Sequence, residues 1–164
     1  MARRAVGKAI AAGLAGGLAG AWTMTKFQQA YSKAAEAMGK HSRNGGGEDA
    51  TMKAAGKISH AILRCDLTRE QRRKAGPLVH YAFGTAVGGL YGAAAEFASP
   101  VKSLSGVPFG AVLFAGADEL AVPAFKLSGP AKRYPASAHI YGLASHVVYG
   151  LTTELVRRLV RRTI

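Results

Sequence analysis

The chain has 164 residues, of which 49% are hydrophobic and only 19% are charged, yet its formal net charge is +13. Soluble domains carry roughly 25% charged residues, so this composition favours a membrane protein. Nucleic-acid binding would need a basic face interleaved with aromatic or polar readers, and the apolar segments of the chain disfavour it. The basic groups are expected to meet anionic lipid headgroups or an acidic partner subunit. The single Cys65 rules out an intrachain disulfide and a cysteine zinc cluster.

The first apolar segment covers residues 9–24 and follows a basic start. This pattern also suits a cleavable signal peptide, but we expect a retained helix. The apolar run is short for a membrane span of about 20 residues. We expect it to continue as an amphipathic helix through Phe27, Tyr31 and Ala35, with Trp22 at the membrane interface.

A polar, basic insertion follows at about residues 25–76. Residues 40–49 include three consecutive glycines and predict a break. A polar helix is expected over 51–64, and Thr68 with Gln71 predicts a capping box that begins another. We expect these helices to lie on the membrane surface or to fold against each other. The apolar side of the first is predicted to be Met52, Ala55, Ile58, Ile62 and Leu63.

Three further apolar segments cover about 77–98, 105–126 and 137–156. Pro77 is expected in the first turn of its helix, where proline is well tolerated, and Pro108 and Pro123 interrupt the next segment. The basic tail after residue 156 should extend the last helix into the headgroups. The sequence therefore predicts an all-α, polytopic membrane bundle of about four helices, the first short, forming one domain over 1–164. The distribution of Lys and Arg leaves its orientation open.

Small residues recur at four-residue spacing along these segments. In lipid, such GxxxG faces let backbones approach closely. They predict packing between helices within one chain, with self-association through the same faces as the alternative. The predicted packing residues are Gly13 and Gly17 in the first segment and Gly84, Gly88 and Gly92 in the second; Gly106 and Gly110 add a further step.

Ionisable side chains inside apolar segments are costly unless they are paired or hydrated. Glu96 and Glu154 are expected to reach the interface from near their helix ends. Asp118, Glu119 and His146 are expected to point into the bundle, in a polar network that also includes His139 and Tyr149. Asp118 and His146 lie at similar depth on either side of the turn near residues 127–136, which predicts that they face each other. Glu119 would then need another partner, such as Tyr149 or water.

Histidines on facing helices can also ligate haem or a pigment metal, which makes His80, His139 and His146 candidate ligands. No CxxCH motif is present, so covalent c-type attachment is excluded, and we expect no cofactor. Nucleophile-elbow, Walker, HExxH and Rossmann motifs are also missing from the sequence. We therefore assign no catalytic residue and no metal site, and we expect a protein that is not an enzyme.

Four stretches of the second half carry a family resemblance. HYAFGTAVGGLYGAAAE, GADELAVP, the LSGP turn and SHVVYGLTTELVRR together resemble the YagU-like family of small bacterial inner-membrane proteins, over about residues 75–162. The resemblance implies a multi-pass location in the inner membrane and, for some members, a link to acid tolerance. It implies no active site.

Three functions remain open on these observations. The first is a non-enzymatic accessory or scaffolding subunit, which would bind other membrane proteins or further copies of itself. The second is a proton- or ion-conducting element that uses Asp118, Glu119, His139 and His146. The third is a haem- or pigment-binding subunit.

Overall fold

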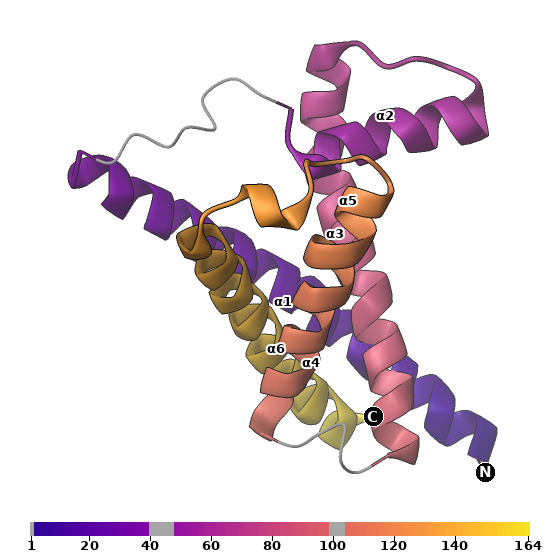
Figure 1. Cartoon of the computed structure of the whole chain (residues 1–164). Coiled ribbons are helices and arrows are strands. Elements are labelled where there is room, and N and C mark those ends of the chain that lie inside the picture. The colour runs from indigo at the N-terminus through magenta and orange to yellow at the C-terminus, as the bar shows by residue number, and fades with distance from the viewer. Residues whose placement is uncertain (1, 40–47, 99–103) are drawn as a thin grey trace.

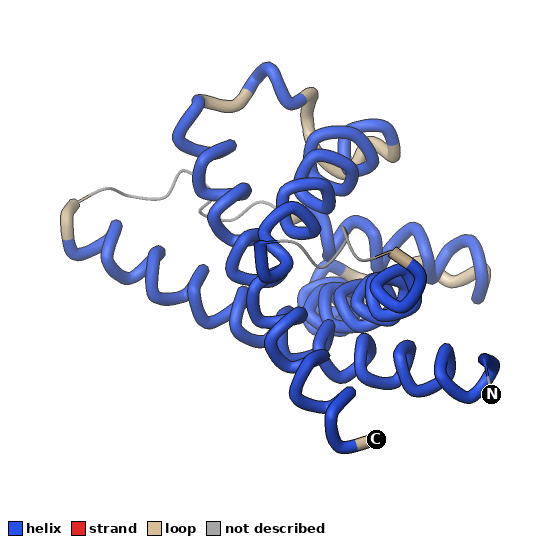
Figure 2. Tube along the Cα trace, turned by 90° about the horizontal axis from the view of Figure 1, so that it is seen from below, coloured by secondary structure: helices blue, strands red, loops and turns tan. Residues whose placement is uncertain are grey.

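The computed structural model describes residues 2–39, 48–98 and 104–164, and these residues are helical or lie in short connections. No strand occurs among them, so the all-α prediction is confirmed (Figure 2). The elements are α1 (Ala2–Ala37), α2 (Ala50–Leu63), α3 (Arg69–Phe97), α4 (Val107–Leu113), η2 (Phe114–Ala121), α5 (Val122–Ala124), η3 (Ala131–Arg133) and α6 (Ala136–Thr163).

The long helix α1 is the centre of the bundle, and α3 and α6 both pack along it (Figure 1). The rod formed by α4, η2 and α5 packs on α6. Both chain ends lie at one end of the bundle, where the Lys8 ammonium donates a hydrogen bond to the carbonyl of Ile164 (Figure 1). Helix α2 lies at the opposite end.

Two helical stretches among the described residues are long and apolar enough to cross a membrane, namely Ala5–Ala37 and Leu104–Ala124. The first contains the predicted segment 9–24, and its helix does continue through Ala35. The second corresponds to the predicted segment 105–126. The remaining predicted spans, 77–98 and 137–156, form parts of α3 and α6 but do not reach the same apolarity.

The polar insertion folds back on the bundle through contacts between α2 and α3. Asp49 caps α2 by accepting a hydrogen bond from the Met52 amide at 2.8 Å. The buried face of α2 is Met52, Ala55 and Ser59. Of the predicted apolar side, Met52 and Ala55 are buried, whereas Ile58, Ile62 and Leu63 are exposed. Of the predicted break at 40–49, residues 40–47 lie outside the described residues.

Pro77 does not begin a helix. It lies inside α3, which starts eight residues earlier at Arg69. The capping box of Thr68 and Gln71 is present, and it supplies the start signal that Pro77 was expected to give. At an interior position Pro77 cannot donate to the carbonyl four residues before it. Pro108, by contrast, occupies the first turn of α4.

The middle of the third apolar segment is a π-helix, η2. The amide of Val122 bonds to the carbonyl of Ala117, and the amide of Leu127 bonds to that of Val122 at 2.9 Å. Both bonds reach back five residues instead of four. Such a wide turn is rare and is often found at functional sites. Pro123 follows directly, where it cannot donate the usual α-helical bond. Asp118 and Glu119 belong to this segment.

Helix α6 runs without interruption from Ala136 to Thr163. The basic tail is thus helical, as predicted. One consequence is that Glu154 lies well inside the helix and not near its end.

Candidate functional site

Glycines bring the helix backbones into direct contact, and this contact determines where the polar side chains meet. A methyl group added at Gly13 would lie 2.8 Å from the Cα of Gly92, and one added at Gly17 would lie 2.8 Å from the Cα of Gly88. Gly84 packs against the side chain of Ala21. The five glycines predicted to pack the first and second apolar segments therefore lie at the junction of α1 and α3. In the same way Gly110 of α4 packs on the backbone of His146 and Val147 in α6.

Two neighbouring carboxylates of η2 both face α6. The Nδ1 of His146 lies 3.8 Å from an Asp118 oxygen, so the structure places this predicted pair together. The Nδ1 of His139 lies 2.7 Å from a Glu119 oxygen. The predicted partner of Glu119 was therefore wrong, since His139 takes the place assigned to Tyr149 or water. Two consecutive side chains of the π-helical segment thus contact residues of one neighbouring helix.

Tyr149 is buried, but it is bonded to backbone and not to a carboxylate. Its hydroxyl donates to the carbonyl of Gly84 at 2.6 Å. Its ring belongs to the small apolar core with Ala21 and Met24. Tyr149 therefore fastens α6 to α3 beside the polar cluster.

The three candidate histidines are held by separate partners. His80 places Nε2 at 3.3 Å from the carbonyl of Ala21, and His146 places Nδ1 at 2.9 Å from the carbonyl of Gly142. His139 is paired with Glu119. Within the described part of the chain, no group of three or more His, Cys, Asp or Glu side chains could hold a metal ion.

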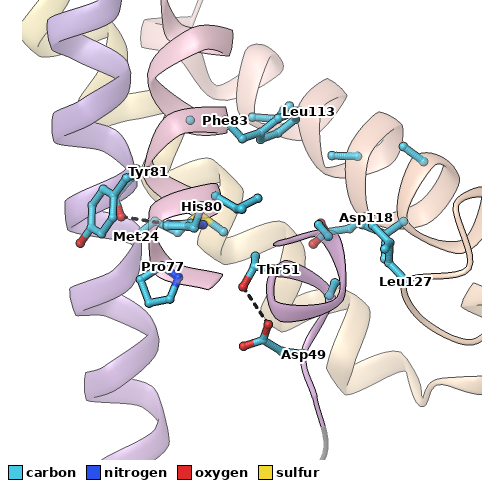
Figure 3. Close-up of a pocket in the computed structure, with 18 of the residues that line it drawn as sticks. Met24, Asp49, Thr51, Pro77, His80, Tyr81, Phe83, Leu113, Asp118 and Leu127 are labelled. Carbon is cyan, nitrogen blue, oxygen red and sulfur yellow. Dashed lines mark hydrogen bonds between the residues drawn. The ribbon is translucent and has the colours of Figure 1, made fainter. Parts of the chain in front are cut away.

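A partly open cavity of about 810 Å³ lies between α1, α2, α3, η2 and α6. Figure 3 shows His80 of α3 and Asp118 of η2 on different walls; between them lie Asp49, the N-cap residue of α2, and Thr51 in its first turn. His146 and Tyr149 line the wall that α6 forms. The cavity thus joins three members of the predicted polar set, Asp118, His146 and Tyr149, to His80. It lies away from Glu119 and His139.

A second polar cluster was missed by sequence reasoning. Glu154 is fully buried and accepts hydrogen bonds from Arg157 at 2.6 and 2.8 Å, from Arg158 at 2.6 Å and from the Tyr91 hydroxyl at 2.9 Å. The prediction that Glu154 snorkels was wrong, because its carboxylate is held inside the bundle by Tyr91, Arg157 and Arg158. Arginines three and four residues later were the available signal, since these positions share one helix face. Glu96 pairs nearby with Arg161 at 3.1 Å.

Comparison with known proteins gives one match. No curated protein and no solved structure matches the chain. The family described as "Protein of unknown function (DUF1440)" matches residues 54–155, a stretch that runs from α2 into α6 and holds Asp118 and both histidines of the cavity. Because this match covers more than half of the chain, the protein belongs to the DUF1440 family.

Proposed function

We propose that this protein is a non-enzymatic, four-span accessory or scaffolding subunit of the bacterial cytoplasmic membrane. The observation that carries the proposal is the exposure of the third segment. Only 6% of the apolar window in Leu104–Ala124 is buried against the rest of the chain, and Val112 and Leu120 are 71% and 68% exposed. A long apolar helix attached along one glycine face leaves its other faces for lipid or for helices of another protein.

Four spans follow if the two apolar helices cross the bilayer. Helix α3 contacts α1 at Gly13 and Gly17, in the middle of the apolar stretch of α1, so both helices share one depth. Helix α6 contacts α1 at Gly16 and Gly20, at the same level. With 29 and 28 residues, α3 and α6 are each about 40 Å long, which is enough to cross a hydrocarbon core of about 30 Å.

The membrane part of the proposal predicts that alkaline carbonate will not extract the protein from membranes. Partner binding is tested by placing a photo-crosslinking residue at Val112 and, as a matched control, at Ile62, which is equally exposed but lies on α2 outside the proposed spans. Val112 is expected to give a discrete protein adduct that Ile62 does not give. A soluble monomer without detergent would overturn the location, and equal adducts at both positions would overturn the docking face.

A proton- or ion-conducting element is the second candidate, and one observation favours it. Asp118 opens onto a cavity that also holds His80 and His146, and intramembrane carboxylates beside imidazoles are typical of proton relays. The resemblance to the YagU-like family, some members of which are linked to acid tolerance, points the same way. Purified protein in liposomes should then dissipate an imposed pH gradient, and Asp118→Asn should abolish that flux. Identical rates in liposomes with and without the protein would remove this candidate.

A further inference from the structure

The cavity between α2, α3 and η2 has the size and lining of a small-molecule site. Its volume of about 810 Å³ falls within the roughly 300–1,000 Å³ of known ligand pockets. Apolar side chains form most of its wall, among them Met24, Phe83 and Leu113 (Figure 3). An occupant of this space needs an apolar body.

The charge of this wall is opposite to that of the whole protein. The chain carries a net +13, yet the described charged residues of the wall are Asp49, Asp118 and Lys57. Asp49 is engaged as the cap of α2, and the Lys57 ammonium donates to the carbonyl of Phe125 at 2.7 Å. Asp118 is left with one loose partner, His146 at 3.8 Å, and its side chain is 45% exposed. The available charge is therefore negative.

Each of the two imidazoles that line the cavity has one nitrogen engaged by a backbone carbonyl. His146 uses Nδ1 to donate to the Gly142 carbonyl, so in its neutral form Nε2 carries a lone pair. His80 uses Nε2 towards the Ala21 carbonyl, which leaves the lone pair on Nδ1. The Asp118 carboxylate complements a cation or a hydrogen-bond donor, and it repels an anion.

Aromatic rings complete the wall. Tyr81, Phe83 and Tyr149 all line the cavity, and ring faces attract organic cations as well as apolar groups. We propose that this cavity binds a hydrophobic organic cation, with the apolar body between α2 and α3 and the positive charge beside Asp118. This binding goes beyond the accessory role and does not depend on it.

The test compares two probes of the same shape and opposite charge, tetraphenylphosphonium and tetraphenylborate. Binding is measured by equilibrium dialysis with the full chain in lipid nanodiscs, after subtraction of uptake by empty nanodiscs. Tetraphenylphosphonium is expected to bind saturably at one site, and tetraphenylborate is expected to show no binding above the empty nanodiscs. Saturable binding of both probes with equal affinity, or of neither, would overturn the proposal.

Three variants locate the site. Asp118→Asn should weaken tetraphenylphosphonium binding at least tenfold, while Glu70→Gln, which removes an exposed carboxylate of α3 outside the cavity, should leave it unchanged. Ala117→Phe keeps the carboxylate but fills the cavity, and should abolish binding. Wild-type affinity in Asp118→Asn or in Ala117→Phe would overturn the assignment. Thermal unfolding of each variant verifies that it is folded, and a misfolded Asp118→Asn leaves the decision to Ala117→Phe.

Discussion

Gly17 of α1 and Gly88 of α3 meet backbone to backbone, so that a methyl group on Gly17 would lie 2.8 Å from the Cα of Gly88. Real Cβ atoms do not approach other atoms this closely. The contact recurs one step along, between Gly13 and Gly92. The position of α3 on α1 therefore depends on the absence of side chains at these residues.

Gly88→Leu is expected to destabilise the bundle by roughly 3 kcal/mol or more, because a bulky side chain forces two backbones apart. The control is Leu90→Ala on the same helix, where the side chain is 71% exposed and truncation removes little packing. Thermal unfolding in mild detergent compares the two. Equal midpoints for both variants would show that the glycine contact is dispensable.

Glu154→Gln is expected to cost about 3–5 kcal/mol, since it leaves the buried guanidinium of Arg157 without its counter-charge. Tyr91→Phe, which removes one hydrogen bond to Glu154, should cost about 1 kcal/mol. Glu36→Gln removes a carboxylate from an exposed position of α1 and serves as the control. The free energies of unfolding are measured by chemical denaturation. Equal values for Glu154→Gln and Glu36→Gln would contradict a structural role for the buried cluster.

His146→Ala is expected to destabilise the protein, and Asp118→Asn should cost less in that background than in the wild type. The coupling between the two should be about 0.5–1 kcal/mol, because the 3.8 Å contact is loose and Asp118 is half exposed. A double-mutant cycle in detergent measures it. The control cycle pairs His146→Ala with Glu119→Gln, whose partner is His139, and should be additive. Additivity in both cycles would mean that Asp118 and His146 do not interact.

Pro77→Ala is expected to stabilise the protein by roughly 1–3 kcal/mol, because alanine restores the amide that an interior helical position needs. Pro108→Ala, in the first turn of α4, should be neutral or slightly destabilising, because proline is favoured there. Chemical unfolding of both variants tests this difference. A loss of stability in Pro77→Ala would show that the ring makes contacts that outweigh the missing hydrogen bond.

Local patterns in the sequence predicted the helices correctly. They predicted the all-helical class, the bounds of α2 to within one residue and the capping box at Thr68, because caps and apolar runs act locally. The predictions failed where two local patterns in the sequence favoured different structures for the same residues. Pro77 was interpreted as a start signal although the capping box upstream already began the helix. Glu154 was expected at the membrane interface although the helical tail places arginines three and four residues after it.

The partners of the polar side chains were harder to predict. Depth along two antiparallel helices places Asp118 opposite His146, since depth depends only on residue count. The partner of Glu119 could not be found in this way, because the argument assumed α-helical rotation between consecutive residues. The π-helical turn changes that rotation, and no pattern in the sequence announces it. The cavity likewise depends on how α2 folds over α3, which no single segment encodes.

The geometry of the polar cluster depends on the number of residues in the π-helical segment. A π turn holds one residue more than the α turn that it replaces, so η2 behaves as an insertion retained within a helix. Deleting Gly116, around which a methyl group would meet nothing within 4 Å, would remove one residue and favour relaxation of the segment to an α-helix. Every residue on one side of the deletion would then rotate relative to α6, and Asp118 and Glu119 could no longer both meet their histidines. In this protein the spacing between residues carries information that residue identity alone does not.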